Sequence, residues 1–291
     1  MSSPPTPGSA WDAPSLLDRA EDHRGDAGWV QAQWEHPGAR VIPVLAAGRV
    51  AWKAGAPGYR APAGALDGRQ FLLGLVDGVP VFAEVATELD ESVGLRQVMD
   101  GLDPTDLQVV FTAAALAAWH EQARFCGGCG TATQPERGGF ARRCPGCGCE
   151  LYPRVDPAVI VAVTDPDDRL LLGRHVGWEG NRRSVFAGFS EAGESLEQAV
   201  HRELFEEVGV RLFDLRYVAS QPWPFPRSLM LAFTARTEDT EIVLDPAEIA
   251  EARWFSRAEL EAALSSGALG LPMRTSVAYR LITAWREGRL R

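Results

Sequence analysis

The chain has 291 residues, of which 46% are hydrophobic and 23% are charged, a composition typical of a soluble globular protein with room for two domains. Its formal net charge of −10 argues against general nucleic-acid binding, which requires a basic surface. Lys53 is the only lysine, so we expect a polyanionic ligand to be held by arginines or by a metal ion.

The first 25 residues are rich in Pro, Ser, Gly and charged side chains, and they lack the basic start and apolar run of a signal peptide. They predict a disordered tail over residues 1–25. The most apolar run, residues 109–119, is shorter than the ~20 residues that a membrane-spanning helix requires. We therefore expect a cytoplasmic protein that is neither secreted nor bound to a membrane.

An N-terminal α+β domain, rich in strands, is predicted over residues 26–121. Apolar runs at 41–52 and 71–85 are broken by short turns, and the second contains the Asp-Gly pair typical of a hairpin. An alanine-rich helix is predicted over 105–124, directly before the first cysteine.

All five cysteines fall within 24 residues, and four of them form two C-x2-C pairs: Cys126, Cys129, Cys144 and Cys147. Two such pairs, without an export signal, predict a zinc ribbon over residues 122–152 with Zn²⁺ bound by the four thiolates. Two disulfides are the alternative, which a reducing compartment disfavours. Four thiolates leave no open position on the ion, so we interpret the zinc as structural and Cys149 as a bystander.

A third domain is predicted over residues 153–291, with an alternation of strands and helices. The predicted strands are 158–164, 169–174, 183–189, 213–220, 229–236 and 252–255, and two late helices are predicted over 258–265 and 275–287.

Between these strands, a helix is predicted over residues 196–208. Ser195 followed by Gln198 is the signature of a capping box, and Gly209 is a natural helix end. At 100° per residue the apolar side chains form one stripe, which predicts the face of the helix that packs against the sheet.

Three carboxylates, Glu203, Glu206 and Glu207, lie inside or beside that stripe and are expected to face inward. Like charges three and four residues apart repel, and on this helix only Glu206 has a basic residue, Arg202, four positions away. A solvated acidic face is the alternative, but the inward placement favours a hard divalent cation, Mg²⁺ or Mn²⁺.

The spacing of the glycines, the arginine and the glutamates resembles the Nudix box, G-x5-E-x7-R-E-U-x-E-E-x-G-U with U aliphatic, at every defined position from Gly188 to Val210. The resemblance implies a Nudix α/β/α sandwich with a mixed sheet and metal-assisted hydrolysis of a nucleoside diphosphate linked to a second group. It also implies that the carbonyl of Ala187 and the side chain of Glu248 complete the metal shell, and that Arg202 orients a ligand carboxylate. His201 is at an undefined box position and is interpreted as a surface residue.

The stretch "SQPWPFPRS", residues 220–228, contains three prolines that are expected to prevent regular structure. A rigid connector is one interpretation. After a Nudix box, however, the stretch resembles the NADH pyrophosphatase subfamily, as do the four-cysteine ribbon and "SVGLRQVMD" at 92–100. This resemblance implies hydrolysis of NADH and NAD⁺ to nicotinamide mononucleotide and AMP, and removal of the same group from NAD-capped RNA.

The resemblance also implies the substrate-binding residues, carried over position by position: Arg96, Tyr152, Phe189, Gln221, Pro222, Trp223, Pro224, Phe225, Pro226, Arg227, Ser228 and Ala278. Two of them, Arg96 and Tyr152, lie outside the Nudix domain, which favours a homodimer that builds each site from two chains. Residues 1–90 show no comparable match. A Nudix enzyme with another substrate and a non-catalytic ligand sensor are the alternative functions, and the intact box argues against the sensor.

Overall fold

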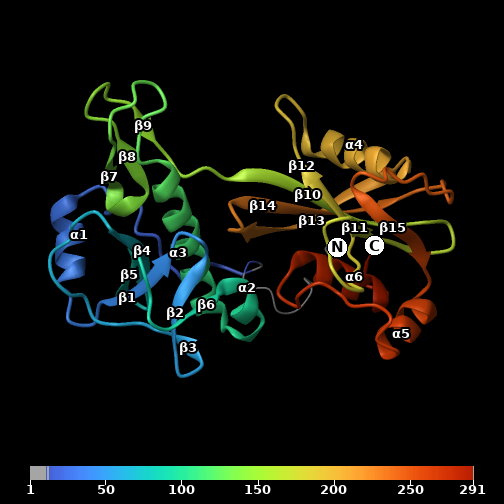
Figure 1. Cartoon of the computed structure of the whole chain (residues 1–291), viewed down its shortest axis with the longest axis horizontal. Helices are drawn as coiled ribbons and strands as arrows, with labels where there is room; N and C mark the ends of the chain where they lie inside the picture. Colours follow the sequence, from blue (N-terminus) through green and yellow to red (C-terminus); the bar gives the residue numbers. More distant parts are fainter. Residues whose placement is uncertain (1–10, 12, 291) are drawn as a thin grey trace. The chain divides into compact units, whose positions relative to one another are not determined.

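The computed structural model describes residue 11 and residues 13–290, which divide into two compact units (Figure 1). The N-terminal unit runs to Val155 and also includes Trp223–Arg227, whereas the C-terminal unit comprises Asp156–Pro222 and the chain from Ser228 onward. Among the described residues, no helix has both the length and the apolar character needed to cross a lipid bilayer.

The N-terminal unit is built on a six-stranded sheet of order β3-β2-β1-β5-β4, with β6 paired to β2. The strands are β1 (Arg40–Leu45), β2 (Arg49–Lys53), β3 (Ala56–Pro57), β4 (Gln70–Val76), β5 (Val79–Val85) and β6 (Ser92–Gly94). The short helices α2 (Leu95–Val98) and η1 (Met99–Gly101) lead into α3 (Pro104–Gln122), which packs against the sheet. The side chain of Asp103 accepts the N–H groups of Thr105 and Asp106 and so caps α3.

Helix α1 (Ala27–Trp34) was not among the predicted elements. Its N-cap, Asp26, accepts hydrogen bonds from Gly28 and Trp29, and Val30 and Trp34 are buried. The Asp before an apolar segment was the one local signal for this helix. Its eight residues are too few to show the 3.6-residue repeat of apolar side chains that is typical of a helix.

The prediction of a disordered tail is wrong for the segment from residue 13 to residue 25, whereas residues 1–10 and 12 lie outside the described part. Leu17 is buried, and Asp18 exchanges two backbone hydrogen bonds with Leu75 of β4, at 2.9 and 2.7 Å. Gly74 makes this pairing possible, because a Cβ there would lie 2.2 Å from the carbonyl oxygen of Asp18. Composition did not reveal the contacts that hold this segment, which also include the N–H of Leu16 and the hydroxyl of Ser15 donating to Gln108.

The zinc ribbon consists of β7 (Gln134–Glu136), η2 (Arg137–Gly139), β8 (Ala141–Arg143) and β9 (Glu150–Leu151), in the order β7-β8-β9. Buried Arg142 donates to Thr133 and to His120 of α3. The imidazole of His120 contacts the carbonyl oxygen of Gly139 at 2.8 Å and stacks on Phe71 of β4. These contacts join the ribbon and the N-terminal sheet in one unit, although the sequence predicted two domains, 26–121 and 122–152.

The C-terminal unit contains a six-stranded sheet of order β13-β14-β10-β11-β15, with β12 paired to β10. The sheet is mixed, since β10 pairs in parallel with β14 and antiparallel with β11 and β12. Its strands are β10 (Asp156–Thr164), β11 (Leu170–His175), β12 (Phe186–Phe189), β13 (Phe213–Trp223), β14 (Ser228–Arg236) and β15 (Ile249–Phe255).

Helix α4 (Leu196–Val208) covers one face of this sheet, and α5 (Arg257–Ser265) and α6 (Val277–Arg286) cover the other (Figure 1). Each face has its own apolar core: Val200 and Leu204 pack on one side, and Leu260 and Leu281 on the other. The α/β/α sandwich predicted from the resemblance is confirmed.

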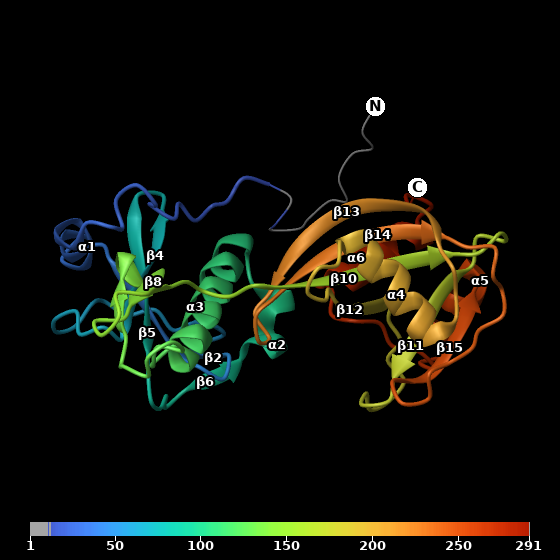
Figure 2. The ribbon, with the colours of Figure 1, turned by 90° about the horizontal axis from the view of Figure 1, so that it is seen from above.

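Strands β13 and β14 form a long curved pair (Figure 2), and β13 contradicts the expectation that residues 220–228 have no regular structure. The strand continues through Pro222 to Trp223 before the chain turns. An edge strand tolerates proline, because the missing N–H can fall on the side without a neighbouring strand. The tip of this pair, Trp223–Arg227, makes its contacts within the N-terminal unit.

Candidate active site and zinc ribbon

The carboxylate-rich helix α4 begins and ends where its local sequence predicts. The hydroxyl of Ser195 accepts the N–H of Gln198 at 3.2 Å, and the side chain of Gln198 accepts the N–H of Ser195 at 2.9 Å. Gly209 ends the helix with a φ of +72°, in the left-handed region that favours glycine.

The three glutamates of the box differ in exposure. Glu207 is buried, with 7% of its surface exposed, and the side chain of Glu203 is 13% exposed. The side chain of Glu206 is 59% exposed, which corrects the expectation that all three face inward. Its position on the helix lies at the edge of the buried stripe, where the sheet no longer covers it.

Gly188 of β12 lies against the Glu203 carboxylate of α4, so that any other residue here requires this side chain to move. A Cβ at this position would lie 1.9 Å from the carboxyl carbon of Glu203. The glycine of the box therefore leaves room for the Glu203 carboxylate against the strand that carries Ala187.

Arg202 connects the acidic side chains of the site. Its guanidinium donates to both carboxylate oxygens of Glu194, at 2.8 and 2.9 Å, and to Glu203 at 2.9 Å. It also donates to Glu206 at 3.1 Å and to the carbonyl oxygen of Phe189 at 2.9 Å. The guanidinium lowers the pKa of Glu194 to about 2. Sequence reasoning assigned no such role to Glu194, although its place in the box was a signal.

Glu207 is the carboxylate that Arg202 does not reach. Its Oε2 is buried and has no hydrogen-bond partner among the described residues. Burial, followed by the charges of Glu203, Glu248 and Asp245, raises the pKa of Glu207 to about 8. Asp245, which sequence reasoning missed, also donates its N–H to the carbonyl oxygen of Glu207 at 3.0 Å.

An unpartnered carboxylate oxygen among like charges fits a hard divalent cation, because Mg²⁺ and Mn²⁺ take oxygen ligands. Glu248 lies in the turn before β15, and its carbonyl oxygen accepts the N–H of Val176. The carboxylate oxygens are less tightly gathered than the ribbon thiols. Within residues 11 and 13–290, only the four-cysteine group has its ligand atoms all within 4.8 Å of one another.

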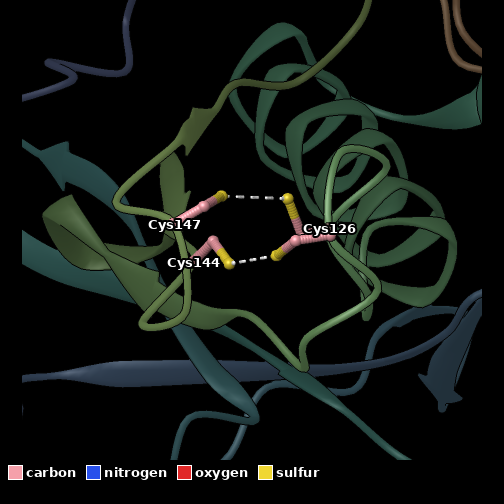
Figure 3. Close-up of side chains that lie close together, drawn as sticks. Cys126, Cys144 and Cys147 are labelled. Carbon is pink, nitrogen blue, oxygen red and sulfur yellow. Dashed lines mark hydrogen bonds between the residues drawn. The ribbon is translucent and has the colours of Figure 1, made fainter.

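The ribbon cysteines bring their sulfur atoms together at one point (Figure 3). The Sγ atoms of Cys126 and Cys147 are 3.6 Å apart, and those of Cys129 and Cys144 are 3.3 Å apart. A tetrahedral Zn²⁺ with bonds of about 2.3 Å places its sulfur ligands about 3.8 Å apart. The thiols are therefore arranged for structural zinc, and all five cysteines are free of disulfides.

The two cysteine pairs have the same backbone geometry. In each, a glycine with positive φ donates its N–H to the carbonyl of the first cysteine: Gly130 to Cys126 and Gly148 to Cys144. The carbonyl of Cys149 accepts the N–H of Cys144 at 2.9 Å, while its thiol is exposed. Cys149 thus closes the second turn through its backbone and stands outside the thiol cluster.

Gln221 has its side chain fully buried in the C-terminal unit. Its Nε2 donates to the carbonyl oxygen of Thr275 at 2.8 Å, and its Oε1 accepts the N–H of Val277 at 2.7 Å. This amide fixes β13 to the start of α6, and both of its polar groups are already used.

The other predicted substrate residues of this unit differ in accessibility. Phe189 has 55% of its surface exposed and Pro222 is exposed, whereas Ser228 and Ala278 are buried. Ala278 is a residue of α6 and packs in the core between this helix and the sheet. Of these four, Phe189 presents the aromatic surface that a nucleotide base could cover.

The remaining predicted residues belong to the N-terminal unit. The Arg96 guanidinium lies 4.7 Å from the ring centre of Phe225 and 5.8 Å from that of Trp223. Phe225 in turn meets Phe111 of α3 edge-on. These contacts make one cation–aromatic cluster from α2, α3 and the turn after β13.

Around this cluster, Arg227 donates to the side chain of Gln122 at 2.9 Å, Pro224 is buried and Pro226 is exposed. Tyr152 is exposed, and its hydroxyl donates to Glu150 at 2.7 Å.

Three family profiles match successive parts of the chain. The NADH pyrophosphatase-like rudimentary NUDIX domain matches residues 43–119, the NADH pyrophosphatase zinc ribbon domain matches 121–152, and the NUDIX domain matches 154–271. The first of these corrects the expectation that residues 1–90 match nothing comparable. The profiles also confirm the ribbon as a zinc-binding module and the family predicted from the box.

The NAD-capped RNA hydrolase NudC of Stutzerimonas stutzeri is 43% identical over 226 residues, which cover 75% of this chain and 78% of that protein. The chain belongs to the NudC family of Nudix hydrolases. The protein of the same description from Mycobacterium bovis is 46% identical over 204 residues, 67% of this Nudix chain and 65% of that relative. The one from Deinococcus radiodurans is 46% identical over 171 residues, which cover 58% of this chain and 61% of that protein. This Nudix chain thus aligns with less than two thirds of the length of the mycobacterial relative.

Proposed function

We propose that the protein hydrolyses the pyrophosphate bond of NADH and NAD⁺ to nicotinamide mononucleotide and AMP, and removes the NAD cap from RNA. The observation that carries the proposal is the buried, unpartnered carboxylate of Glu207 within an intact Nudix box. The description of the relatives as NAD-capped RNA hydrolases supports the choice of substrate.

Glu203, Glu206 and Glu207 would hold Mg²⁺ or Mn²⁺, with the carbonyl oxygen of Ala187 and the side chain of Glu248. When bound, the cation offsets the charge of the pyrophosphate and lowers the pKa of the attacking water. One of the three box glutamates, or a carboxylate outside α4, takes the proton from that water.

Arg202 acts as a positioning residue in this mechanism. It is paired with Glu194, Glu203 and Glu206, and therefore keeps the two candidate ligands in fixed orientations. Its N–H groups donate to these carboxylates and to a backbone carbonyl oxygen. We therefore assign contact with the substrate phosphates to the cation rather than to Arg202.

Substrate recognition is assigned to the residues carried over from the subfamily. Phe189 exposes a ring for stacking on a base, and Trp223 and Phe225 offer two more rings beside Arg96. Because Arg96 and Tyr152 belong to the N-terminal unit, we propose a homodimer in which one chain completes the site of the other.

Product analysis separates the candidate functions. The purified protein is incubated with NADH, NAD⁺, NAD-capped RNA or ADP-ribose, under Mg²⁺ and under Mn²⁺, and the products are identified by chromatography. Release of nicotinamide mononucleotide and AMP from NADH is expected. Faster turnover of ADP-ribose than of all three NAD substrates would favour a different Nudix specificity, and ligand binding without turnover would show a sensor.

Subunit mixing tests the shared site. Glu207→Gln and Arg96→Ala are each expected to be nearly inactive alone. If each site takes Arg96 from one chain and Glu207 from the other, random mixing should restore activity to about a quarter of the parental value, because half of the dimers carry one intact site. No recovery in a mixture shown to exchange subunits would contradict the proposed arrangement.

A further inference from the structure

The N-terminal unit contains a cavity of about 700 Å³ between α1, the segment before β4 and the ribbon. Its volume lies in the range of small-molecule sites. Apolar walls come from Val30 of α1, Leu66 and Pro135 of β7, and two arginines, Arg24 and Arg137, line it as well. This cavity belongs to the part of the chain that carries no Nudix box.

Arg24 lines this cavity with a largely buried guanidinium. Its side chain is 13% exposed, and its Nη1 is buried without a hydrogen-bond partner among the described residues. The guanidinium stacks on Phe140 at 4.0 Å, and its closest carboxylate, Glu21, is 3.8 Å from Nη2. The exposed part of this guanidinium can pair with an anion in the cavity, because Glu21 is its only carboxylate partner within 4.0 Å among the described residues.

Arg137 adds a second positive charge on an exposed side chain. Its φ of +52° lies in the left-handed region, which is unfavourable for a non-glycine residue. Two residues further on, Gly139 packs against Phe71, from which a Cβ at that position would lie 2.5 Å away. Burial lowers the pKa of Arg24, Glu21 raises it, and the charge of Arg137 lowers it further, so the two arginines repel each other.

The acidic residues that line the cavity offset this charge only in part. Glu136 and Glu150 are both paired with Arg143, at 2.8 and 2.5 Å. Their carboxylates are therefore already engaged. The three arginines and two glutamates of the lining carry a net charge of +1, although the chain as a whole carries a net charge of −10.

We propose that this cavity is a second ligand site, which binds an organic phosphate of the size of a nucleoside monophosphate. The phosphate pairs with Arg24 and Arg137, since guanidinium groups match phosphate oxygens in a bidentate manner. The apolar body of the ligand covers Val30, Leu66 and Pro135. This site is separate from the proposed hydrolysis and does not depend on it.

Photoaffinity labelling with 8-azido-AMP tests the site in the full-length, zinc-loaded protein without added divalent cation. Peptide mapping by mass spectrometry is expected to place part of the label within residues 24–31, 66–70 or 135–143. Excess AMP should suppress this label, whereas adenosine, which lacks the phosphate, should suppress it at least tenfold less well. Label confined to other segments would overturn the proposal.

Two variants and one control complete the experiment. Arg24→Gln and Arg137→Gln should each weaken AMP binding at this site at least tenfold, measured as the AMP concentration that halves the label. Arg137 is exposed, so Arg137→Gln is expected to fold even if Arg24→Gln does not. Arg69→Gln removes an exposed arginine of the same unit that does not line the cavity, and should leave the label unchanged. Equal labelling of Arg137→Gln and the parent would contradict the role of the arginines.

Discussion

Replacing Glu207 by Gln should make the metal-free protein more stable above pH 7 and nearly inactive at the same time. The buried carboxyl of Glu207 has its pKa raised from 4.5 to about 8, mainly by burial and then by its acidic neighbours. In this range the folded state binds more protons than the unfolded state, so the free energy of unfolding falls as pH rises from about 4.5 to about 8. At about 1.4 kcal/mol per pH unit, the loss is about 5 kcal/mol once the carboxyl is ionised.

The amide of Glu207→Gln cannot ionise, so this loss should be absent from the variant. Urea unfolding of both proteins at pH 6 and pH 9 measures the difference, in buffer freed of Mg²⁺ and Mn²⁺ by exchange rather than by a chelator that would also remove zinc. Between pH 6 and pH 9 we expect the C-terminal unit of the parent to lose about 3 kcal/mol relative to the variant, because the rest of the loss is already complete at pH 6. Adding Mn²⁺ should restore the parent and leave the variant unchanged, because the cation offsets the charge of Glu207.

Activity supplies the second half of this prediction. The kcat of Glu207→Gln on NADH should fall by on the order of 10²–10³ or more, as expected for loss of a group that stabilises charge in the transition state. Glu197→Gln is the matched control, since Glu197 is an exposed carboxylate on the same helix. It should keep both the parental kcat and the parental pH dependence. Parallel pH profiles for the parent and Glu207→Gln, or NADH hydrolysis by the variant at the parental rate, would refute the mechanism.

Three further predictions concern other parts of the chain. Cys144→Ser should retain less than the one zinc per chain expected of the parent by elemental analysis, and full zinc content in this variant would contradict the four-thiolate site. Burial lowers the pKa of His120 to about 3 from 6.5, with a further contribution from Arg142, so the N-terminal unit should lose about 1 kcal/mol between pH 7 and pH 5.5 as the unfolded state takes up the proton. His120→Gln, compared by urea unfolding, should lose less over that interval, and an equal loss would exclude the histidine as the cause. Gly188→Ala should lower kcat at least tenfold, because the new Cβ would displace Glu203 from a position 1.9 Å away, and a fully active variant would show that strand and helix can separate without consequence.

The sequence by itself determined the features that depend on near neighbours. The bounds of α4 follow from Ser195, Gln198 and Gly209, whose capping interactions are complete within a few residues of each helix end. The four-thiol cluster follows from the two C-x2-C pairs in the same way, because each pair turns within five residues. The box motif and the resemblance built on it then indicated the family, which the comparisons confirmed.

Tertiary structure alone decided which charged groups of the site are buried and which are paired. The exposure of Glu206, the isolation of Glu207 and the pairing of Arg202 with Glu194 depend on how closely β12 and the turn before β15 approach α4. The parallel pairing of β10 with β14, the burial of Gln221 against the start of α6 and the place of Arg24 at a cavity likewise join segments far apart in the chain. Caps and periodicity are set by a few neighbouring residues, whereas solvation and charge pairing depend on distances that exist only after the layers have packed.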